Sequence, residues 1–368
     1  MVLSTSDAAK LFTPMAIGPY KLRNRVIMSP MTRNRTDMDL VPTDLMQEYY
    51  EQRSSAGLII TEATQVSEDG QGYPLTPGVF TPQQIEGWKK ITNAIHDKGG
   101  LVFCQLWSCG RVSHSSFMKD GRMPPAPSAI KPTEGQAITM TGMQDYEVPR
   151  EMTVEEIKTC VEQFAQGAKS CIEAGFDGIE VHGANGYLID QFLKSESNAR
   201  TDEYGGSLEN RLRFLVEILE ATTAAIGADK VGLHLTPGGT VNGCVDKDSK
   251  ANFTYFIAEI NKQFGGLAYL HIKLSDEQDE RHGGEVIPIE YIRSIYDGVL
   301  VTNNHYTKDL AEEELSAGKA DAVAFGRLYV SNPDLVERFK TGAETAEWDH
   351  STFFGGTEKG YTDYPPMK

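Results

Sequence analysis

The sequence contains eight short apolar runs, separated by segments that carry helix start signals. The runs cover residues 25–28, 58–62, 101–106, 178–182, 231–235, 267–273, 298–302 and 322–325. Continuous apolar runs are typical of parallel strands that are covered on both faces. Three of the intervening segments begin at a residue type that caps helices, namely Thr81, Thr153 and Ser207. Eight strand–helix units in succession predict an α/β fold of the (β/α)8 TIM barrel type.

An open, doubly wound sheet is the structural alternative, because alternation of strands and helices does not by itself distinguish an open sheet from a closed one. Sheets of that kind usually bind nucleotides through glycine-rich loops. The sequence has neither a GxGxxG motif after a strand nor a GxxxxGKS or GxxxxGKT motif. The barrel is therefore favoured.

The length of the chain allows one large domain or two ordinary ones, since it has 368 residues and 40% hydrophobic content. No Gly/Ser-rich linker or low-complexity segment divides it. We therefore expect a single domain over residues 1–368. The longest connection follows the third predicted strand, where we expect residues 111–149 to form a loop or lid excursion.

Charge and cysteine content restrict the partners and the compartment. The formal net charge of −17 disfavours binding to nucleic acid or to anionic membranes. Five cysteines without CxxC or Cys/His ligand spacing indicate neither disulfides nor a metal site. No apolar run reaches about 18 residues, and no secretion signal is recognisable. We expect a cytoplasmic protein, either monomer or homodimer.

Three proton-capable side chains lie at or after the carboxyl end of the fourth predicted strand: His182, Asn185 and Tyr187. Gly183 and Gly186 allow the chain to bend there, so these side chains can share one space. His182 and Asn185 can both donate hydrogen bonds to one acceptor oxygen, and the Tyr187 phenol is a neutral acid. Two donors and one acid suit enolate chemistry. A buried histidine beside ordinary turn residues is the alternative on side-chain chemistry alone.

The run HGANGYLIDQFLKSESNARTDEYGGSLENR, which begins at His182, resembles the corresponding run of the Old Yellow Enzyme family of FMN-dependent ene-reductases. Further segments share the resemblance along nearly the whole chain. They are LRNRVIMSPMTR at 22–33, AGLIITEAT at 56–64, GYPLTPGVF at 72–80, CQLW at 104–107 and FGRLYVSNPDL at 325–335. The resemblance implies that His182 and Asn185 bind the substrate and that Tyr187 donates a proton.

The resemblance also implies an FMN site at the carboxyl ends of the strands. The residues expected around the flavin ring are Pro30, Met31, Thr32, Ala63, Gln105, His182, Asn185 and His234. The phosphate is expected after the seventh and eighth strands, at Asn303, Asn304, Gly326 and Arg327. Trp107 and Phe354 are expected to form walls of the substrate pocket.

Four residues depart from the family pattern. Ser108 stands where many relatives have His, Phe354 where several have Tyr, and Asn303 where Gly is usual. Asn tolerates a positive φ better than most residues, which would preserve the backbone donors at 303. His234 stands where relatives usually have an Arg that faces the flavin. Two alternatives stay open: His234 gains a proton on flavin reduction, or it stays neutral while Lys273 or another cation supplies the charge.

The leading hypothesis is an oxidoreductase that uses FMN and NADPH, with NADH possible, to reduce the activated C=C bond of α,β-unsaturated carbonyl or nitro compounds. Hydride would pass from flavin N5 to Cβ, and Tyr187 would protonate Cα. A non-redox barrel lyase or hydrolase that uses His182 as base is one rival. A flavin-binding protein that has lost catalysis is another. A yellow protein that releases FMN would exclude the first rival, and NAD(P)H oxidation would exclude the second.

Overall fold

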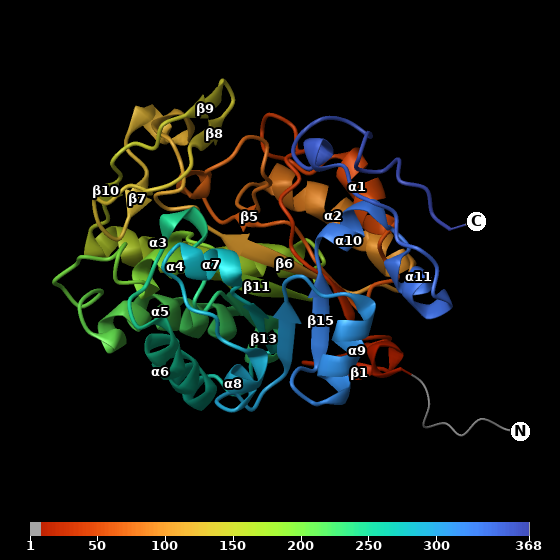
Figure 1. Ribbon diagram of the computed structural model, residues 1–368. Helices are drawn as coiled ribbons and strands as arrows, with labels where there is room; N and C mark the ends of the chain where they lie inside the picture. Colours follow the sequence, from red (N-terminus) through yellow and green to blue (C-terminus); the bar gives the residue numbers. More distant parts are fainter. Residues whose placement is uncertain (1–8, 368) are drawn as a thin grey trace, which may run out of the picture.

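Eight parallel strands form a closed barrel in the computed structural model, which describes residues 9–367 (Figure 1). The strands are β3 (Val26–Met28), β4 (Leu58–Ile60), β6 (Val102–Trp107), β11 (Gly178–Gly183), β12 (Val231–Leu235), β13 (Tyr269–Lys273), β14 (Leu300–Asn303) and β15 (Ala322–Phe325). Each strand pairs with the next of the eight, and β15 pairs with β3 to close the ring. The predicted barrel is confirmed, and every predicted strand end lies within two residues of the observed one.

Helices surround the barrel. They are α1 (Asp44–Glu51), α2 (Pro82–Asp97), α3 (Val154–Glu173), α4 (Leu188–Leu193), α5 (Leu208–Ile226), α6 (Ser249–Gln263), α7 (Glu277–Arg281), α8 (Ile289–Arg293), α9 (Lys308–Ser316), α10 (Arg327–Ser331) and α11 (Leu335–Thr341). Short 3-10 turns lie at Lys10–Phe12, Glu68–Gly70, Ser115–Phe117, Lys119–Gly121, Ala228–Lys230, Val241–Gly243 and His350–Thr352. The predicted caps Thr81, Thr153 and Ser207 each accept a hydrogen bond from a backbone N–H three residues later.

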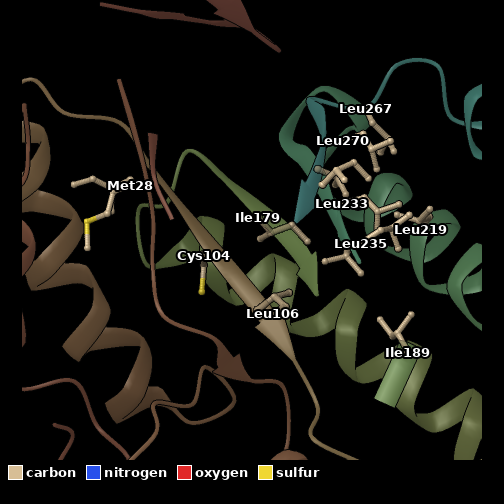
Figure 2. Close-up of a cluster of buried hydrophobic side chains, with 14 of the residues drawn as sticks. Met28, Cys104, Leu106, Ile179, Ile189, Leu219, Leu233, Leu235, Leu267 and Leu270 are labelled. Carbon is tan, nitrogen blue, oxygen red and sulfur yellow. The ribbon is translucent and has the colours of Figure 1, made fainter. Parts of the chain in front are cut away.

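Side chains alternate between the inside and the outside of the ring because strand side chains have a period of two. The inner cluster contains Ile27, Phe103 and Tyr269. The outer cluster packs strands against helices, and Figure 2 shows part of it, with Ile179, Leu233 and Leu270 from neighbouring strands. The strands therefore have apolar residues on both faces, as their continuous apolar runs predict.

The amino-terminal end of the barrel is covered by a hairpin of β1 (Met15–Ile17) and β2 (Tyr20–Leu22). Its residues Ile17 and Leu22 belong to the inner apolar cluster. The opposite end, at the strand carboxyl termini, is where polar side chains replace apolar ones inside the ring. This end is therefore available for a site.

The expected excursion lies between β6 and α3. It contains β7 (Pro125–Ala126), which pairs with β10 (Arg150–Glu151), and a hairpin of β8 (Ala137–Thr139) and β9 (Gly142–Gln144). A further short strand, β5 (Thr64–Gln65), pairs with β6. In Figure 1 the β8–β9 hairpin rises above the rest of the molecule. Among residues 9–367, no helix combines the length and apolar content needed to cross a bilayer.

Candidate active site

Polar side chains from neighbouring strands meet inside the carboxyl end of the barrel. The backbone register places His182 opposite His234, and His234 opposite His271. Glu180 lies opposite Gln105 in the same way. Since paired residues of parallel strands point to the same face, all five side chains point into the ring. The structure thus brings together the predicted residues His182, His234 and Gln105.

Aromatic rings hold His182 and Tyr187 next to each other. The His182 and Tyr187 rings are 5.1 Å apart between centroids and nearly perpendicular, at 80°. Trp107 contacts both, stacked on His182 at 6.0 Å and edge-on to Tyr187 at 4.7 Å. Tyr73 also stacks on Trp107, at 5.9 Å. Such packing fixes the rotamers of groups that must point at one reacting molecule.

A cavity of about 410 Å³ opens beside these rings. Its lining includes three predicted site residues, Thr32, Tyr187 and Phe354, of which Phe354 comes from the C-terminal segment and is 58% exposed. The remaining lining residues were not predicted; they are Asn34, Tyr73, Pro74, Leu75, Ile138 and Gly355. Ile138 comes from β8, so the excursion forms part of the cavity wall. The wall is mostly apolar, which suits an organic ligand of small to medium size.

Tyr187 shares a hydrogen bond with Tyr73, with 3.0 Å between the two hydroxyl oxygens. Burial raises the pKa of Tyr187 above its ordinary value, and burial likewise raises the pKa of Tyr73. Tyr187 is therefore protonated at neutral pH and can act as an acid. Tyr73 lies in the Gly-Tyr-Pro segment after β4. Its sequence signal is only a tyrosine beside turn residues.

His182 is a neutral imidazole at physiological pH. Burial, followed by the nearby His271, lowers the pKa of His182 to about 3. Its Nδ1 has no hydrogen-bond partner among residues 9–367. Since buried polar atoms are nearly always paired in native proteins, this free nitrogen indicates that a ligand completes the site.

Glu180 organises the histidines behind His182. Its carboxylate accepts hydrogen bonds from Gln105 Nε2 at 2.7 Å and from His271 Nδ1 at 2.9 Å. Gln105 Nε2 also lies 3.2 Å from His234 Nδ1, which must then accept. The single proton of a neutral His234 is therefore on Nε2, an atom without a partner in the described chain. Glu180 and His271 were not predicted.

Burial, followed by the two neighbouring histidines, lowers the pKa of His234 well below its ordinary value. Of the two alternatives for His234, this favours the neutral donor over the proton-linked one. Lys273 lines a different cavity, described next.

A second cavity, of about 370 Å³, lies after β14 and β15. Its lining contains the four predicted phosphate residues, Asn303, Asn304, Gly326 and Arg327. Ser29 and Lys273 also line it. Two cations, Lys273 and Arg327, suit an anion. The expectation of a positive φ at Asn303 is wrong: the positive values are at Asn304 (117°) and His305 (54°). The Asn303 side-chain amide instead donates to Ser29 Oγ at 2.5 Å, a contact that glycine at this position could not make.

Three further residues expected around the flavin ring, Pro30, Met31 and Ala63, follow β3 and β4. Pro30 and Met31 are half-buried after β3, and the Met31 sulfur lies close to Gly326. Ala63 is buried in a small cluster with Trp107. Nitrogens of His182 and His234 that have no partner within residues 9–367, an anion cavity and an apolar cavity fit the ring and phosphate of FMN.

Arginines fasten the C-terminal segment that carries Phe354. The Arg33 guanidinium donates to the carbonyl oxygens of Phe353, at 2.8 Å, and Gly360, at 2.9 Å. The backbone N–H of Arg33 donates to the Glu62 carboxylate at 3.2 Å. The same carboxylate thus helps to fix the loop on which the neighbouring Thr32 lies.

Comparison with known proteins agrees with this geometry. The model of the NADH:flavin oxidoreductase / NADH oxidase family matches residues 10–346. A probable flavin mononucleotide-dependent alkene reductase of Leishmania infantum is 42% identical, over 97% of this chain and 97% of its own. Morphinone reductase in complex with tetrahydroNAD has a similar structure, with TM-score 0.90, 43% identity and 98% of each chain covered. An old yellow enzyme homologue from Zymomonas mobilis gives TM-score 0.91 and 40% identity, over 97% of this chain and 99% of that one.

The chain belongs to the Old Yellow Enzyme family. It is therefore an FMN-dependent oxidoreductase of the ene-reductase type, and the non-redox lyase or hydrolase is excluded. The rival without catalysis is disfavoured as well, because relatives similar over nearly their whole length are named reductases.

Glu62 generates a prediction on pH and stability. Burial raises the pKa of its carboxyl group to about 7. A raised folded pKa means that stability is fully present below the unfolded pKa, about 4.5, and is lost as pH rises through 7. We expect Glu62→Gln, which cannot ionise, to gain up to about 3 kcal/mol relative to wild type between pH 5 and pH 8. Thermal midpoints of both proteins across that interval measure the gain; a difference that is constant with pH would contradict it.

Proposed function

We propose that the protein reduces the activated C=C bond of α,β-unsaturated carbonyl or nitro compounds, with Tyr187 as the proton donor. The observation that carries the proposal is the contact between a neutral His182 and a protonated Tyr187, whose ring centroids are 5.1 Å apart, with Tyr187 in the wall of the 410 Å³ cavity. The His182 and Asn185 side chains would donate hydrogen bonds to the carbonyl or nitro oxygen, on which negative charge develops.

His182 suits this role because it is neutral and has a free nitrogen. A neutral donor holds the oxygen without transferring a proton to it, so the proton is left to Tyr187. Tyr187 lines the cavity, and its hydroxyl shares a hydrogen bond with the Tyr73 hydroxyl at 3.0 Å. Tyr187 would give its proton to Cα, and Tyr73 is placed to hydrogen-bond the phenolate that remains.

When bound, FMN supplies the redox chemistry: it accepts a hydride from a nicotinamide and passes one to Cβ of the alkene. Gln105 and the Nε2–H of His234 would hold the pyrimidine edge of the ring, with Pro30, Met31, Thr32 and Ala63 around it. Arg327, Gly326, Asn303 and Asn304 would hold the phosphate, with Lys273 as a second cation. Trp107 and Phe354 would complete the substrate pocket.

We propose NADPH as the reductant, on the family resemblance. None of the described residues that line the 410 Å³ cavity is charged, so recognition of its 2′-phosphate would depend on residues beyond that wall. A cytoplasmic location fits the five cysteines, all buried and unpaired. The proposed state is a monomer or homodimer. Steady-state rates with NADPH and NADH, and sedimentation, test these points.

Removal of the proposed acid should separate the two half-reactions. Tyr187→Phe should leave flavin reduction by NADPH nearly unchanged and slow alkene reduction by about 10² to 10⁴, the usual cost of losing a general acid. Anaerobic stopped-flow measurements give both rates. Tyr296→Phe, at a buried tyrosine whose hydroxyl has no partner within residues 9–367, is the matched control. Equal loss in both half-reactions would contradict the assignment.

The two proposed donors should act on one oxygen. His182→Ala or Asn185→Ala should weaken binding of a phenol, whose phenolate oxygen occupies the same place, by about tenfold or more, because each charge-assisted bond contributes about 1.5 to 3 kcal/mol. Titration of the long-wavelength charge-transfer band with a phenol measures the affinity. Asn261→Ala, at a half-buried position of α6 where the amide binds Asp297, serves as the control. Unchanged affinity in both donor variants would reject a shared oxygen.

His234 should tune the flavin as a neutral donor. His234→Arg places a permanent cation there and should raise the reduction potential by about 30 to 60 mV, the equivalent of one charge-assisted hydrogen bond. Because burial keeps the pKa of His234 far below neutrality, the potential-versus-pH curves of wild type and variant should be parallel between about pH 6 and 9. Curves that converge toward low pH would show instead that His234 gains a proton on reduction.

A further inference from the structure

The backbone of Asn185 is held by side chains rather than by a helix or sheet. Asn185 has a left-handed φ of 55°. Its N–H donates to Thr236 Oγ1 at 2.9 Å, and its carbonyl oxygen accepts from Asn242 Nδ2 at 2.8 Å. The direction in which the Asn185 side chain leaves the backbone therefore depends on these partners.

The backbone of the next residue, Gly186, is held in the same way from α4. Its φ is 75°. Its N–H donates to Asp190 Oδ2 at 2.8 Å, and its carbonyl oxygen accepts from Gln191 Nε2 at 2.7 Å. A Cβ on Gly186 would lie 2.4 Å from the carbonyl oxygen of Val241, so only glycine fits. Tyr187 follows directly, and the turn sets where its side chain starts.

Asp190 is itself fixed by a buried cation. Lys194 Nζ lies 3.0 Å from Asp190 Oδ2, and the two side chains are 1% and 0% exposed. Lys194 also donates to the carbonyl oxygen of Gly239 at 2.7 Å. Stability alone is a weak reason for such a pair, because apolar residues of similar volume often replace buried ion pairs without loss.

Gln191 connects the turn to the segment after β6. Its Nε2 also donates to the carbonyl oxygen of Cys109 at 3.0 Å, and its Oε1 accepts from the N–H of Arg111 at 3.1 Å. The turn that carries Asn185 is thereby tied to the chain that carries Trp107, two residues before Cys109. Gln191 therefore holds both the segment that carries Trp107 and the turn that carries Asn185 and Tyr187.

We propose that Gln191 and Asp190, which is held by its ion pair with Lys194, are positioning residues. They hold the backbone N–H and carbonyl oxygen of Gly186 and thereby orient the side chains of Asn185 and Tyr187. This inference rests on the proposed roles of Asn185 and Tyr187 in the reaction. The positioning concerns only the conformation of the turn at residues 184–188, so it can be tested separately from those roles.

Two double variants isolate the contact. Both replace the ion pair by uncharged side chains: Asp190→Asn/Lys194→Met keeps an oxygen that can accept from Gly186 N–H, and Asp190→Leu/Lys194→Met removes it. Hydrogen exchange of the FMN-loaded enzyme is measured in peptides covering residues 184–188. We expect exchange there to be about tenfold faster in the Leu variant than in the Asn variant, since one buried hydrogen bond is lost. Equal exchange in the two variants would overturn the inference.

Phenol affinity adds a second reading. It should fall about tenfold in the Leu variant but remain near wild type in the Asn variant. In an Asn185→Ala background the Leu change should weaken binding little further, because both act through the same amide. Full additivity would count against positioning. If Asn185→Ala alone leaves phenol affinity unchanged while exchange still differs, the proposed function fails and the positioning stands.

Two further variants guard against ambiguous loss of fold. Asp177→Asn alters another acid, paired with His96 at 3.0 Å at the amino end of β11, and should change neither exchange at 184–188 nor phenol affinity. If the Leu variant does not fold, Gln191→Glu removes the donor to the Gly186 carbonyl oxygen from the other side. It should raise exchange at 184–188 by a similar factor, and unchanged exchange would overturn the inference.

Discussion

Closure of the strand ring, completed where β15 pairs with β3, determines where every proposed site residue points. In a closed parallel sheet, alternate side chains point inward, and inward residues of neighbouring strands meet. Near the amino ends these are apolar, such as Phe103 and Tyr269. Two residues further along the same strands they become Gln105 and His271. One alternation thus produces both the packed core and the polar floor of the site.

The polar side chains at the carboxyl end of the ring are held together by the Glu180 carboxylate, both of whose oxygens accept hydrogen bonds. Glu180 accepts from Gln105 and His271, and Gln105 in turn donates to His234. An unpaired buried carboxylate would be costly, so these bonds fix the tautomer of His234 as well as its place. Within residues 9–367, His182 Nδ1 and His234 Nε2 have no partner, and a flavin and a substrate would complete these hydrogen bonds.

The features that could be predicted from the sequence are those set by neighbouring residues along the chain. Apolar runs located the strands, and residues at or just after the strand ends, such as His182 and Arg327, were predicted at the carboxyl end because parallel strands align there. It missed Tyr73, Asn242 and Asp190, whose loops and short helix are placed by contacts far along the chain. It also misplaced the left-handed backbone at Asn303, because only the path of the loop shows that Asn304 and His305 make the turn. Resemblance to a family supplied the roles, which residue types alone left open.

In the proposed reaction, hydride and proton reach different carbons of the alkene from different sources. Isotope placement in the product distinguishes the two sources. Reduction of an enone with nicotinamide deuterated at the transferred position, in ordinary water, should give a saturated ketone labelled only at Cβ. Reduction with ordinary nicotinamide in D₂O, analysed before exchange beside the carbonyl, should label Cα through the Tyr187 hydroxyl, which exchanges with solvent. Nicotinamide label at Cα, or no saturated product from any activated alkene, would contradict the account.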